Sequence, residues 1–269
     1  MSITSHDQPP RDRSPVRQAM ERGKLVVGTF VFEFATPGIG RLASGAGAEF
    51  VIYDAEHTGW SYETLRTLVA TTHGAEPYVR VPETGRSAIS RALDIGARGI
   101  MVPMVESTEQ AEAIVSWAKY PPDGVRGAAF GMAHDGYVRS DNIAYMRWAN
   151  TEPLILTQIE TTRGLAAVDA IAAVAGVDVL WVGHYDLTNS MGIPGQFDHP
   201  DYRAALDQVA AAANSHGKYA GFMAGSPAEA HMLVERGFSL IAYGGDLWVY
   251  QDALRAGIVE VHGRGRATR

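Results

Sequence analysis

The sequence predicts an α/β protein whose eight parallel strands close into a (β/α)₈ barrel. Short segments that are apolar on both faces and rich in β-branched or aromatic residues recur along the chain, which is typical of parallel strands covered on both sides. Helix signals lie between them, and the 269 residues suit a barrel, which often uses about 250 residues as one domain. An open doubly wound sheet is the alternative, because a strand count made from one sequence can be wrong by one or two. The predicted strands are residues 25–32, 49–57, 77–81, 99–105, 154–160, 179–183, 219–224 and 240–246.

The chain before the first strand is expected to hold a loose leader and one short helix. Residues 1–13 are polar and contain prolines, as poorly ordered termini often do. Ser14 and Pro15 then supply an N-cap and a first-turn proline, and Gly23 supplies a stop. No repeat or linker divides the rest, so residues 14–269 are predicted to form one domain.

Capping residues mark helix starts between the strands. Ser107 with Gln110, and Ser226 with Glu229, fit the capping box, in which the two residues bond each other's backbone N–H groups. These signals place a helix after the fourth and after the seventh predicted strand.

The segment 120–153 is too long for a simple connection between a helix and a strand. We expect a functional loop there, followed by a helix around residues 144–150. His134 lies in this loop and is expected at the surface.

Composition and charge exclude several classes of function. The net charge of −7 gives no general attraction to nucleic acid or anionic lipid. The chain has no cysteine, which excludes disulfides, thiolate metal ligands and a cysteine nucleophile. No stretch approaches the roughly 20 apolar residues of a membrane span, and the N-terminus lacks the apolar core of a signal peptide. A cytoplasmic protein without a nucleic-acid or membrane partner is therefore expected.

Polar residues gather at the predicted strand ends. In barrel enzymes the reacting groups lie at the carboxyl ends of the strands. A strand-end carboxylate can simply cap the next helix, and a single histidine is more often structural. Several ionisable groups at one small mouth are, however, costly to keep together without a metal or substrate. The residues are Asp54, Glu56 and His57 after the second strand, Arg80 in the third, Gln158 and Glu160 in the fifth, and Gly183, His184, Tyr185 and Asp186 after the sixth.

Common catalytic motifs are missing from the sequence. It contains no HExxH, no GxxxxGK[ST] and no GxSxG, so a zinc protease, a P-loop nucleotidase and a serine hydrolase of the nucleophile-elbow type are not favoured. Its glycine pairs lack the third glycine of the dinucleotide-binding motif.

Six motifs together resemble the HpcH/HpaI aldolase family, which includes 4-hydroxy-2-oxoheptanedioate aldolase and 2-dehydro-3-deoxyglucarate aldolase. The resemblance covers about residues 23–257, and the order and spacing of the motifs agree as well. The motifs are YDAEH at 53–57, YVRVP at 78–82, LDIGARGIMVPMVES at 93–107, YPPDGVRG at 120–127, QIET at 158–161 and VGHYDLTNSMG at 182–192.

The resemblance implies an architecture and a cofactor. The fold would be a TIM barrel of the phosphoenolpyruvate/pyruvate-binding type, whose last helix is exchanged with a neighbouring subunit in a homohexamer built as a trimer of dimers. Mg²⁺, Mn²⁺ or Co²⁺ would be held by Glu160 and Asp186. Two carboxylates, with water and substrate oxygens in the other positions, suit such a hard octahedral ion.

The resemblance also implies which groups bind pyruvate. Arg80 and Gln158 would contact its keto side. The backbone amides that follow Gly183, at His184 and Tyr185, would hold its carboxylate.

A further set of residues would support proton transfer. By resemblance, His57 would be the acid/base group and Asp94 its orienting partner. Asp54 and Glu56 would form a second layer around metal-bound water.

The expected reaction is reversible cleavage of a 4-hydroxy-2-oxo acid into pyruvate, or an analogue such as hydroxypyruvate, and an aldehyde. A divalent cation and Arg80 would stabilise the enolate of pyruvate. The only lysines are Lys24, Lys119 and Lys218, and none is expected at the mouth, which favours a metal mechanism over an imine one. Two alternatives remain: oxaloacetate decarboxylation or chemistry like that of macrophomate synthase on the same site, and a barrel that binds without catalysis.

One departure from the family pattern bears on the substrate. Relatives often have Gly-Pro-Ala-Asp where this chain has Gly183-His184-Tyr185-Asp186. The two larger polar side chains beside the carboxylate pocket are expected to narrow it or to contact the second substrate.

Overall fold

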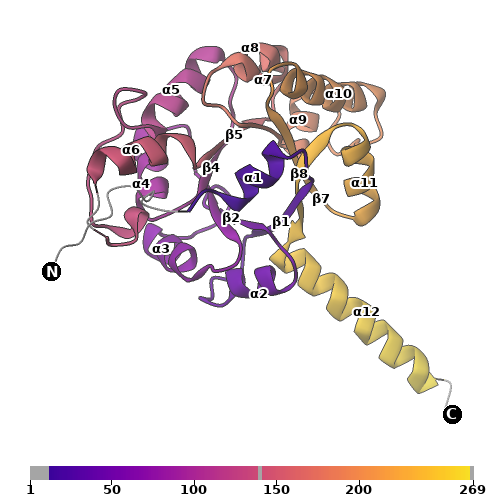
Figure 1. Ribbon diagram of the computed structural model, residues 1–269. Coiled ribbons are helices and arrows are strands. Elements are labelled where there is room, and N and C mark those ends of the chain that lie inside the picture. Colours follow the sequence, from indigo (N-terminus) through magenta and orange to yellow (C-terminus); the bar gives the residue numbers. More distant parts are fainter. Residues whose placement is uncertain (1–11, 139–140, 267–269) are drawn as a thin grey trace.

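Eight parallel strands form a closed barrel in which each strand pairs with the next and β8 pairs with β1. The computed structural model describes residues 12–138 and 141–266 (Figure 1). The predicted barrel is confirmed, and the open sheet is excluded because β1 and β8 are hydrogen-bonded to each other. The strands are β1 Val26–Val31, β2 Phe50–Asp54, β3 Glu76–Arg80, β4 Gly99–Val102, β5 Leu154–Ile159, β6 Val179–Val182, β7 Tyr219–Ala224 and β8 Phe238–Gly245.

Helices lie outside the barrel between successive strands, as the sequence predicts. The helix before β1 starts at Pro15 with Ser14 as its N-cap, so the expected short helix is confirmed. The helices are α1 Pro15–Glu21, α2 Ile39–Gly45, α3 Tyr62–Thr71, α4 Arg86–Asp94, α5 Thr108–Ala118, the 3₁₀ helix η1 Ala133–Asp135, α6 Asn142–Thr151, α7 Thr162–Ala166, α8 Val168–Ala173, α9 His184–Ser190, α10 Pro200–Ser215, α11 Pro227–Glu235 and α12 Asp246–Arg266.

The core has two layers, because the strands bury both of their faces. The outward-facing side chains pack against the surrounding helices and form the larger apolar cluster. The inward-facing side chains form a second cluster, which also contains Val16, Ala19 and Met20 of α1. Helix α1 therefore closes the amino end of the barrel (Figure 1), and the carboxyl end is the one that can open to substrate.

The predicted helix caps are present in a shifted form. The hydroxyl of Ser107 accepts the N–H of Gln110, but the Gln110 amide oxygen accepts the N–H of Glu106 rather than that of Ser107. At α11 the hydroxyl of Ser226 accepts the N–H of Glu229, and Glu229 in turn accepts an N–H one residue earlier than in the standard box. In both cases two N–H groups are still satisfied.

The long segment before β5 contains η1 and α6, which confirms the predicted helix around residues 144–150. The expectation that His134 is exposed is wrong: the residue is 3% exposed, and its Nε2 lies 2.8 Å from the carbonyl oxygen of Ala129. Its ring lies 5.4 Å from that of Tyr145, at the edge of an aromatic cluster that also contains Tyr120. The imidazole is a structural group there.

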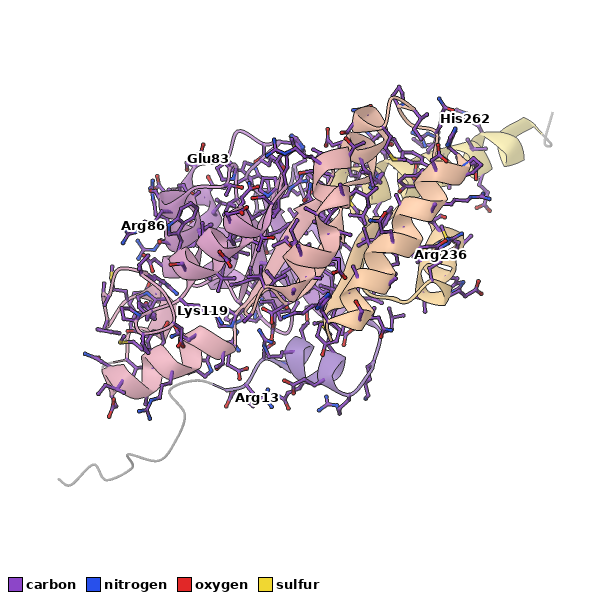
Figure 2. The ribbon with its side chains drawn as sticks, turned by 90° about the horizontal axis from the view of Figure 1, so that it is seen from above. Arg13, Glu83, Arg86, Lys119, Arg236 and His262 are labelled. Atoms are coloured by element: carbon purple, nitrogen blue, oxygen red, sulfur yellow. The ribbon has the colours of Figure 1, made fainter. Side chains whose placement is uncertain are left out.

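The first turns of α12 contact the loop after β1, and the rest of the helix projects away from the barrel, as seen in Figure 1 and, from above, in Figure 2 near the label of His262. Several of its large apolar side chains are exposed: Trp248, Val249, Tyr250, Leu254, Ile258, Val259 and Val261. No helix in the described part of the chain is long and apolar enough to cross a membrane.

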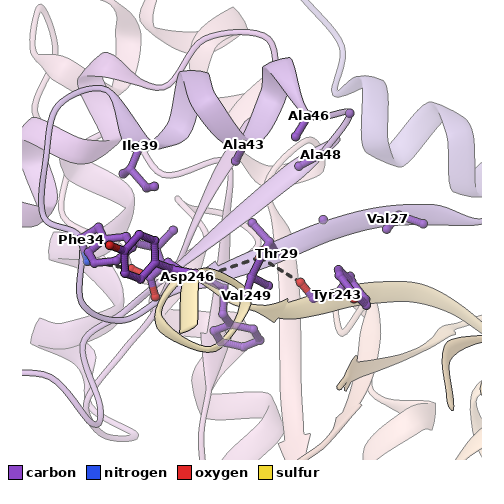
Figure 3. A pocket seen from close by; sticks show the side chains of 15 residues that line it. Val27, Thr29, Phe34, Ile39, Ala43, Ala46, Ala48, Tyr243, Asp246 and Val249 are labelled. Carbon is purple, nitrogen blue, oxygen red and sulfur yellow. Dashed lines mark hydrogen bonds between the residues drawn. The ribbon is translucent and has the colours of Figure 1, made fainter. Parts of the chain in front are cut away.

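A largely apolar groove of about 490 Å³ runs along β1 between α2 and the start of α12. Figure 3 shows Ile39 and Ala43 of α2, and Ala46 just after it, on one side, with Tyr243 and Val249 on the other. In a (β/α)₈ barrel the helix after the last strand would cover the seam between that strand and β1. The groove lies at this seam because α12 projects away from it.

The predicted leader, residues 1–13, is only partly covered, since residues 1–11 lie outside the described part of the chain. Arg13 forms ion pairs with Glu21, at 2.8 Å, and with Glu152, at 3.2 Å.

Candidate active site

A cavity of about 190 Å³ opens at the carboxyl ends of the strands and brings together most of the residues singled out from the sequence. Its polar lining comes from β3, β5 and the start of α9, together with the loop after β2. Its apolar lining comes mainly from β1, β6, β7 and α12. The polar and charged residues are His57, Arg80, Gln158, Gly183, His184, Tyr185 and Asp186, and the apolar ones include Phe30, Phe32, Trp181, Met223 and Trp248.

Arg80 is the centre of a charged network at the end of β3. Its Nε donates to Asp54 Oδ1, and its Nη1 lies 3.2 Å from Glu56 Oε2. The rings of Phe30 and Phe32 lie 5.3 and 5.8 Å from the guanidinium carbon. Neighbouring strands β2 and β3 pair Asp54 with Arg80 in register, so this ion pair follows directly from the sheet. The guanidinium is thereby held in one orientation facing the cavity.

Asp54 also shapes the loop that carries Glu56 and His57. Its carboxylate accepts the N–H of Glu56 at 3.2 Å and the N–H of His57 at 2.8 Å. The side chain is fully buried, and its own carbonyl oxygen accepts the hydroxyl of Thr58. Such bonds from an Asp to the following backbone form a tight turn, which presents His57 at the mouth with 59% of its side chain exposed.

Glu56 has an environment that disfavours its charged form. Burial raises the pKa of Glu56 to about 7; the positive charge of Arg80 opposes the shift, and the negative charges of Asp54 and Asp186 add to it. Glu56 Oε2 is also 3.8 Å from His57 Nε2. Glu56 therefore lies between the guanidinium and the imidazole, and its own carboxyl can gain or lose a proton near neutral pH.

Glu160 is fixed at the edge of the cavity by two donors. Gln158 Nε2 donates to its Oε2, and the N–H of Met104 donates to its Oε1 at 2.6 Å. Met104 has a φ of +55°, a left-handed conformation that is unusual for a residue other than glycine. The strained turn aims its N–H at the carboxylate, and strain of this kind tends to occur at functional sites.

Gly183 is required by the close approach of β6 to Glu160. A Cβ at this position would lie 2.7 Å from the Glu160 Cβ and 2.9 Å from Gln158 Nε2, and would collide with Glu160 Oε2. The glycine therefore allows the end of β6 and the start of α9 to lie against the carboxylate.

The carboxylates of Glu56, Glu160 and Asp186 lie close enough for their charges to affect one another. Burial raises the pKa of Glu160 to about 7; the hydrogen bonds from Gln158 and Met104 oppose this shift, and the negative charges of Glu56 and Asp186 add to it. Asp186 lies in the first turn of α9 and is exposed. Like charges gathered in this way favour either a bound proton or a bound cation.

The donor set fits a hard divalent cation that takes only some of its ligands from protein. Within residues 12–138 and 141–266, no group of three or more His, Cys, Asp or Glu side chains is arranged to hold a metal ion by itself. Glu160 and Asp186 can supply two carboxylate oxygens, and the Gln158 Oε1 is buried without a hydrogen-bond partner. Oxygen donors with positions left for water and substrate suit Mg²⁺ or Mn²⁺.

His184 and Tyr185 form an aromatic wall on one side of the cavity. The His184 ring stacks on Phe222 at 5.0 Å and lies 4.6 Å from the ring of Tyr185, which meets Phe197 edge-on at 5.2 Å. Burial and the charge of Arg80 lower the pKa of His184 to about 4, so the imidazole is neutral near pH 7. The two residues that depart from the family pattern are thus both at the cavity.

The structure does not bring Asp94 to His57 within one chain. Asp94 is the last residue of α4, and each barrel helix runs back to the amino end of the next strand, whereas His57 lies at the carboxyl end. Asp94 instead pairs with Arg126 at 2.6 Å, and the acidic partner of His57 is Glu56. The expected pairing of Asp94 with His57 is therefore corrected for the single chain.

Asp246 and Met104 were not singled out from the sequence, although both shape the site. Asp246 accepts the N–H groups of Phe32, Glu33 and Phe34 at 2.7 to 3.0 Å, and so fixes the loop after β1. It follows β8 directly, so the strand-end rule that selected Glu160 would have found it. The role of Met104 depends on its backbone conformation, which its residue type does not indicate.

Comparison with known proteins shows the family of this chain. Residues 31–253 match the HpcH/HpaI aldolase/citrate lyase family. The chain belongs to this family. It is 34% identical over 244 residues to 2-keto-3-deoxy-L-rhamnonate aldolase of Klebsiella pneumoniae, covering 90% of each chain. It is also 34% identical over 245 residues to hydroxypyruvate/pyruvate aldolase of Pseudomonas aeruginosa, covering 89% of each.

The crystal structure of an HpcH/HpaI aldolase from Desulfitobacterium hafniense has the same fold, with a TM-score of 0.87 and 33% identity, over 91% of this chain and 96% of that one. The chain is therefore an enzyme of the aldolase type, a carbon–carbon lyase. HpcH/HpaI aldolases are class II aldolases, which generally depend on a divalent metal.

Proposed function

We propose that this HpcH/HpaI aldolase reversibly cleaves 4-hydroxy-2-oxo acids to pyruvate, or hydroxypyruvate, and an aldehyde, with Mg²⁺, Mn²⁺ or Co²⁺ bound by Glu160 and Asp186. The observation that carries the proposal is the arrangement around Glu160, where a buried carboxylate held by two donors faces Asp186 beside Arg80. The similarity to a hydroxypyruvate/pyruvate aldolase supports the choice of 2-oxo acid.

A bound divalent ion would supply the positive charge that makes the enolate of pyruvate accessible. The protein contributes its own charge through Arg80, which is 8% exposed and held by Asp54 and Glu56. A fixed guanidinium beside the keto oxygen stabilises negative charge as it develops there, without reorganising during the reaction. Gln158, whose Oε1 is free, lines the same side of the cavity.

The carboxylate of the 2-oxo acid fits the start of α9. The first backbone N–H groups of a helix have no partners within the helix, and here they belong to the residues after Gly183, including His184 and Tyr185. These N–H groups point out of the helix end and attract an anion. The 2-oxo acid would then lie with its keto oxygen beside Arg80 and its carboxylate at the start of α9.

His57 is the group placed to move the proton of the reaction. In cleavage, the 4-hydroxyl loses its proton, the bond between C3 and C4 breaks, and the electron pair passes into the enolate while C4 becomes the aldehyde. An imidazole can accept that proton and return it in the addition direction. Glu56, 3.8 Å from His57 Nε2, is the neighbouring acidic group. Any part played by Asp94 would require a second copy of the chain, because within one chain Asp94 is bound to Arg126.

The test is pyruvate release from a panel of 4-hydroxy-2-oxo acids, coupled to lactate dehydrogenase, first with EDTA and then with Mg²⁺, Mn²⁺ or Co²⁺ restored. Release that stops with chelator and returns with metal supports the proposal, and Glu160→Ala and Asp186→Ala should each abolish it. Full activity in either variant would contradict the metal assignment. No release from any substrate, with oxaloacetate still decarboxylated, would support the alternative activity on the same site.

We also propose that α12 is exchanged between subunits of a homo-oligomer, a hexamer by family resemblance. Two features support this: the exposed apolar side chains along α12, and the apolar groove at the β8–β1 seam. An exposed apolar surface of this kind is usually an interface. The mass in solution, measured by light scattering after size-exclusion chromatography, tests it; a monomer at micromolar concentration would contradict it.

A further inference from the structure

A second cavity, of about 540 Å³, adjoins the first, and we call it the outer cavity and the first the inner cavity. Four residues line both cavities: His184, Tyr185, Met223 and Trp248. The inner cavity holds the groups proposed to bind the 2-oxo acid, and the outer cavity offers adjoining space for the part of the substrate that becomes the aldehyde. A volume of this size is typical of a small-molecule site.

The walls shared by the two cavities are aromatic and held by packing. The His184 ring stacks on Phe222, with ring centroids 5.0 Å apart, and is tilted against the Tyr185 ring, whose centroid is 4.6 Å away. Trp248 packs edge-on against Phe32 at 5.2 Å, and this Phe32 belongs to the loop fixed by Asp246. Tyr185 and Trp248 nevertheless expose 60% and 44% of their surface. They therefore offer aromatic faces that a flat apolar group can cover.

The charges around the outer cavity are negative. Among the described residues that line it are Glu229 and Asp252, and none is Lys or Arg. Glu229 accepts the N–H of Gly225 at 2.7 Å, and Asp252 pairs with Arg255 at 2.6 Å, where both side chains are about 70% exposed. Arg80, which lines the inner cavity, is already paired with two carboxylates. An aldehyde with its own carboxylate would find like charge and no free cationic partner.

We propose that the outer cavity binds the aldehyde and selects an uncharged aromatic aldehyde over one that carries a carboxylate. This inference rests on the proposed aldolase function. In the addition direction, the C3 carbon of the enolate bonds to the aldehyde carbon, whose oxygen takes up a proton to become the 4-hydroxyl. The substituent on the aldehyde carbon then lies against Tyr185 and Trp248.

The experiment compares benzaldehyde with succinic semialdehyde as acceptors for pyruvate, using the full-length Mn²⁺-loaded enzyme and following product by chromatography. We expect kcat/KM for benzaldehyde to be at least about tenfold higher, mainly through KM. Tyr185→Ala and Trp248→Ala should each reduce that preference. A wild-type enzyme that uses succinic semialdehyde equally well, or better, overturns the proposal.

A charge substitution tests the electrostatic part. Glu229→Arg should lower KM for succinic semialdehyde by about tenfold, because it places a cation in the cavity lining. Glu235→Arg makes the same change on an exposed position of the same helix outside the lining, and should leave that KM unchanged. Equal effects of the two substitutions would contradict the proposal.

A third experiment distinguishes failure of this inference from failure of the proposed aldolase function. It follows by NMR the exchange of the pyruvate methyl protons for deuterium in the absence of any aldehyde. Metal-dependent exchange combined with no preference for benzaldehyde would overturn the inference alone. No exchange, and no aldol product with either aldehyde, would overturn both.

Discussion

Lowering the pH should weaken metal binding, because the carboxylate proposed as a ligand takes up a proton near neutrality. Burial raises the pKa of Glu160 to about 7, with Glu56 and Asp186 contributing like charge. A cation binds only the ionised carboxylate, so metal and proton compete. With a pKa of about 7, Glu160 is almost fully ionised at pH 8 and only about one-tenth ionised at pH 6.

The dissociation constant for Mn²⁺ should therefore rise by about tenfold between pH 8 and pH 6, equivalent to about 1.4 kcal/mol. Glu56, whose pKa is also raised to about 7 by burial, adds to this dependence because its ionised form at higher pH attracts the cation. Titration calorimetry at pH 6, 7 and 8, in buffers with different heats of ionisation, gives both the affinity and the number of protons released. Close to one proton should be released at pH 6.

The raised pKa of Glu160 also makes the stability of the folded protein depend on pH. The pKa of Glu160 is near 4.5 in the unfolded chain and about 7 in the folded protein. The contribution of this carboxyl to the stability of the folded state is therefore fully present below pH 4.5 and is lost as the pH rises through about 7. Saturating Mn²⁺ should then raise the melting temperature more at pH 8 than at pH 5.5. Glu160→Gln removes the titrating group and is the control. An Mn²⁺ affinity that is the same at pH 6 and pH 8, with binding intact, would refute the reasoning.

Three further predictions concern the proton-transfer group, the glycine beside Glu160 and the last helix. His57→Ala should slow aldol cleavage by a factor of about 10² to 10⁴ and leave Mn²⁺ affinity unchanged; equal rates in variant and wild type would remove His57 from the mechanism. Gly183→Ala should weaken Mn²⁺ binding by at least about tenfold, because the new methyl group collides with Glu160. Gly225→Ala is the control, since there is space for a Cβ at that position, and it should leave Mn²⁺ binding unchanged. Calorimetry on both variants measures the difference. Ending the chain after residue 251 should lower the mass of the assembly in light scattering, and an unchanged mass would exclude α12 as the element that joins the subunits.

The barrel could be predicted from the sequence because its strands are buried on both faces. A parallel strand covered on both sides is a short, almost continuous apolar run, and all eight runs are strands. Arg80, Gln158, Gly183 and Asp186 could be placed at one mouth by the rule that a barrel collects its strand ends there, and the cavity contains all four. These site residues could thus be predicted mainly because the barrel places all strand ends at one mouth.

What the sequence left open depends on side-chain direction and on backbone conformation. Asp94 was placed beside His57 by resemblance, yet it ends a helix that points to the other end of the barrel. His134 was expected at the surface because loops usually are exposed, whereas it is buried at the edge of an aromatic cluster. Met104 contributes only a backbone N–H, through a left-handed turn that depends on its neighbours in space.

Asp246 connects the last helix to the loop that borders the cavity. It is the first residue of α12 and also the acceptor for three N–H groups of the loop after β1, which carries Phe32 over the cavity. Whatever holds α12 therefore also holds one side of the mouth. If α12 docks on a neighbour, dilution that separates the subunits loosens this loop by mass action. Specific activity should then fall on dilution and recover on concentration, in the way expected of a catalyst that is complete only when assembled.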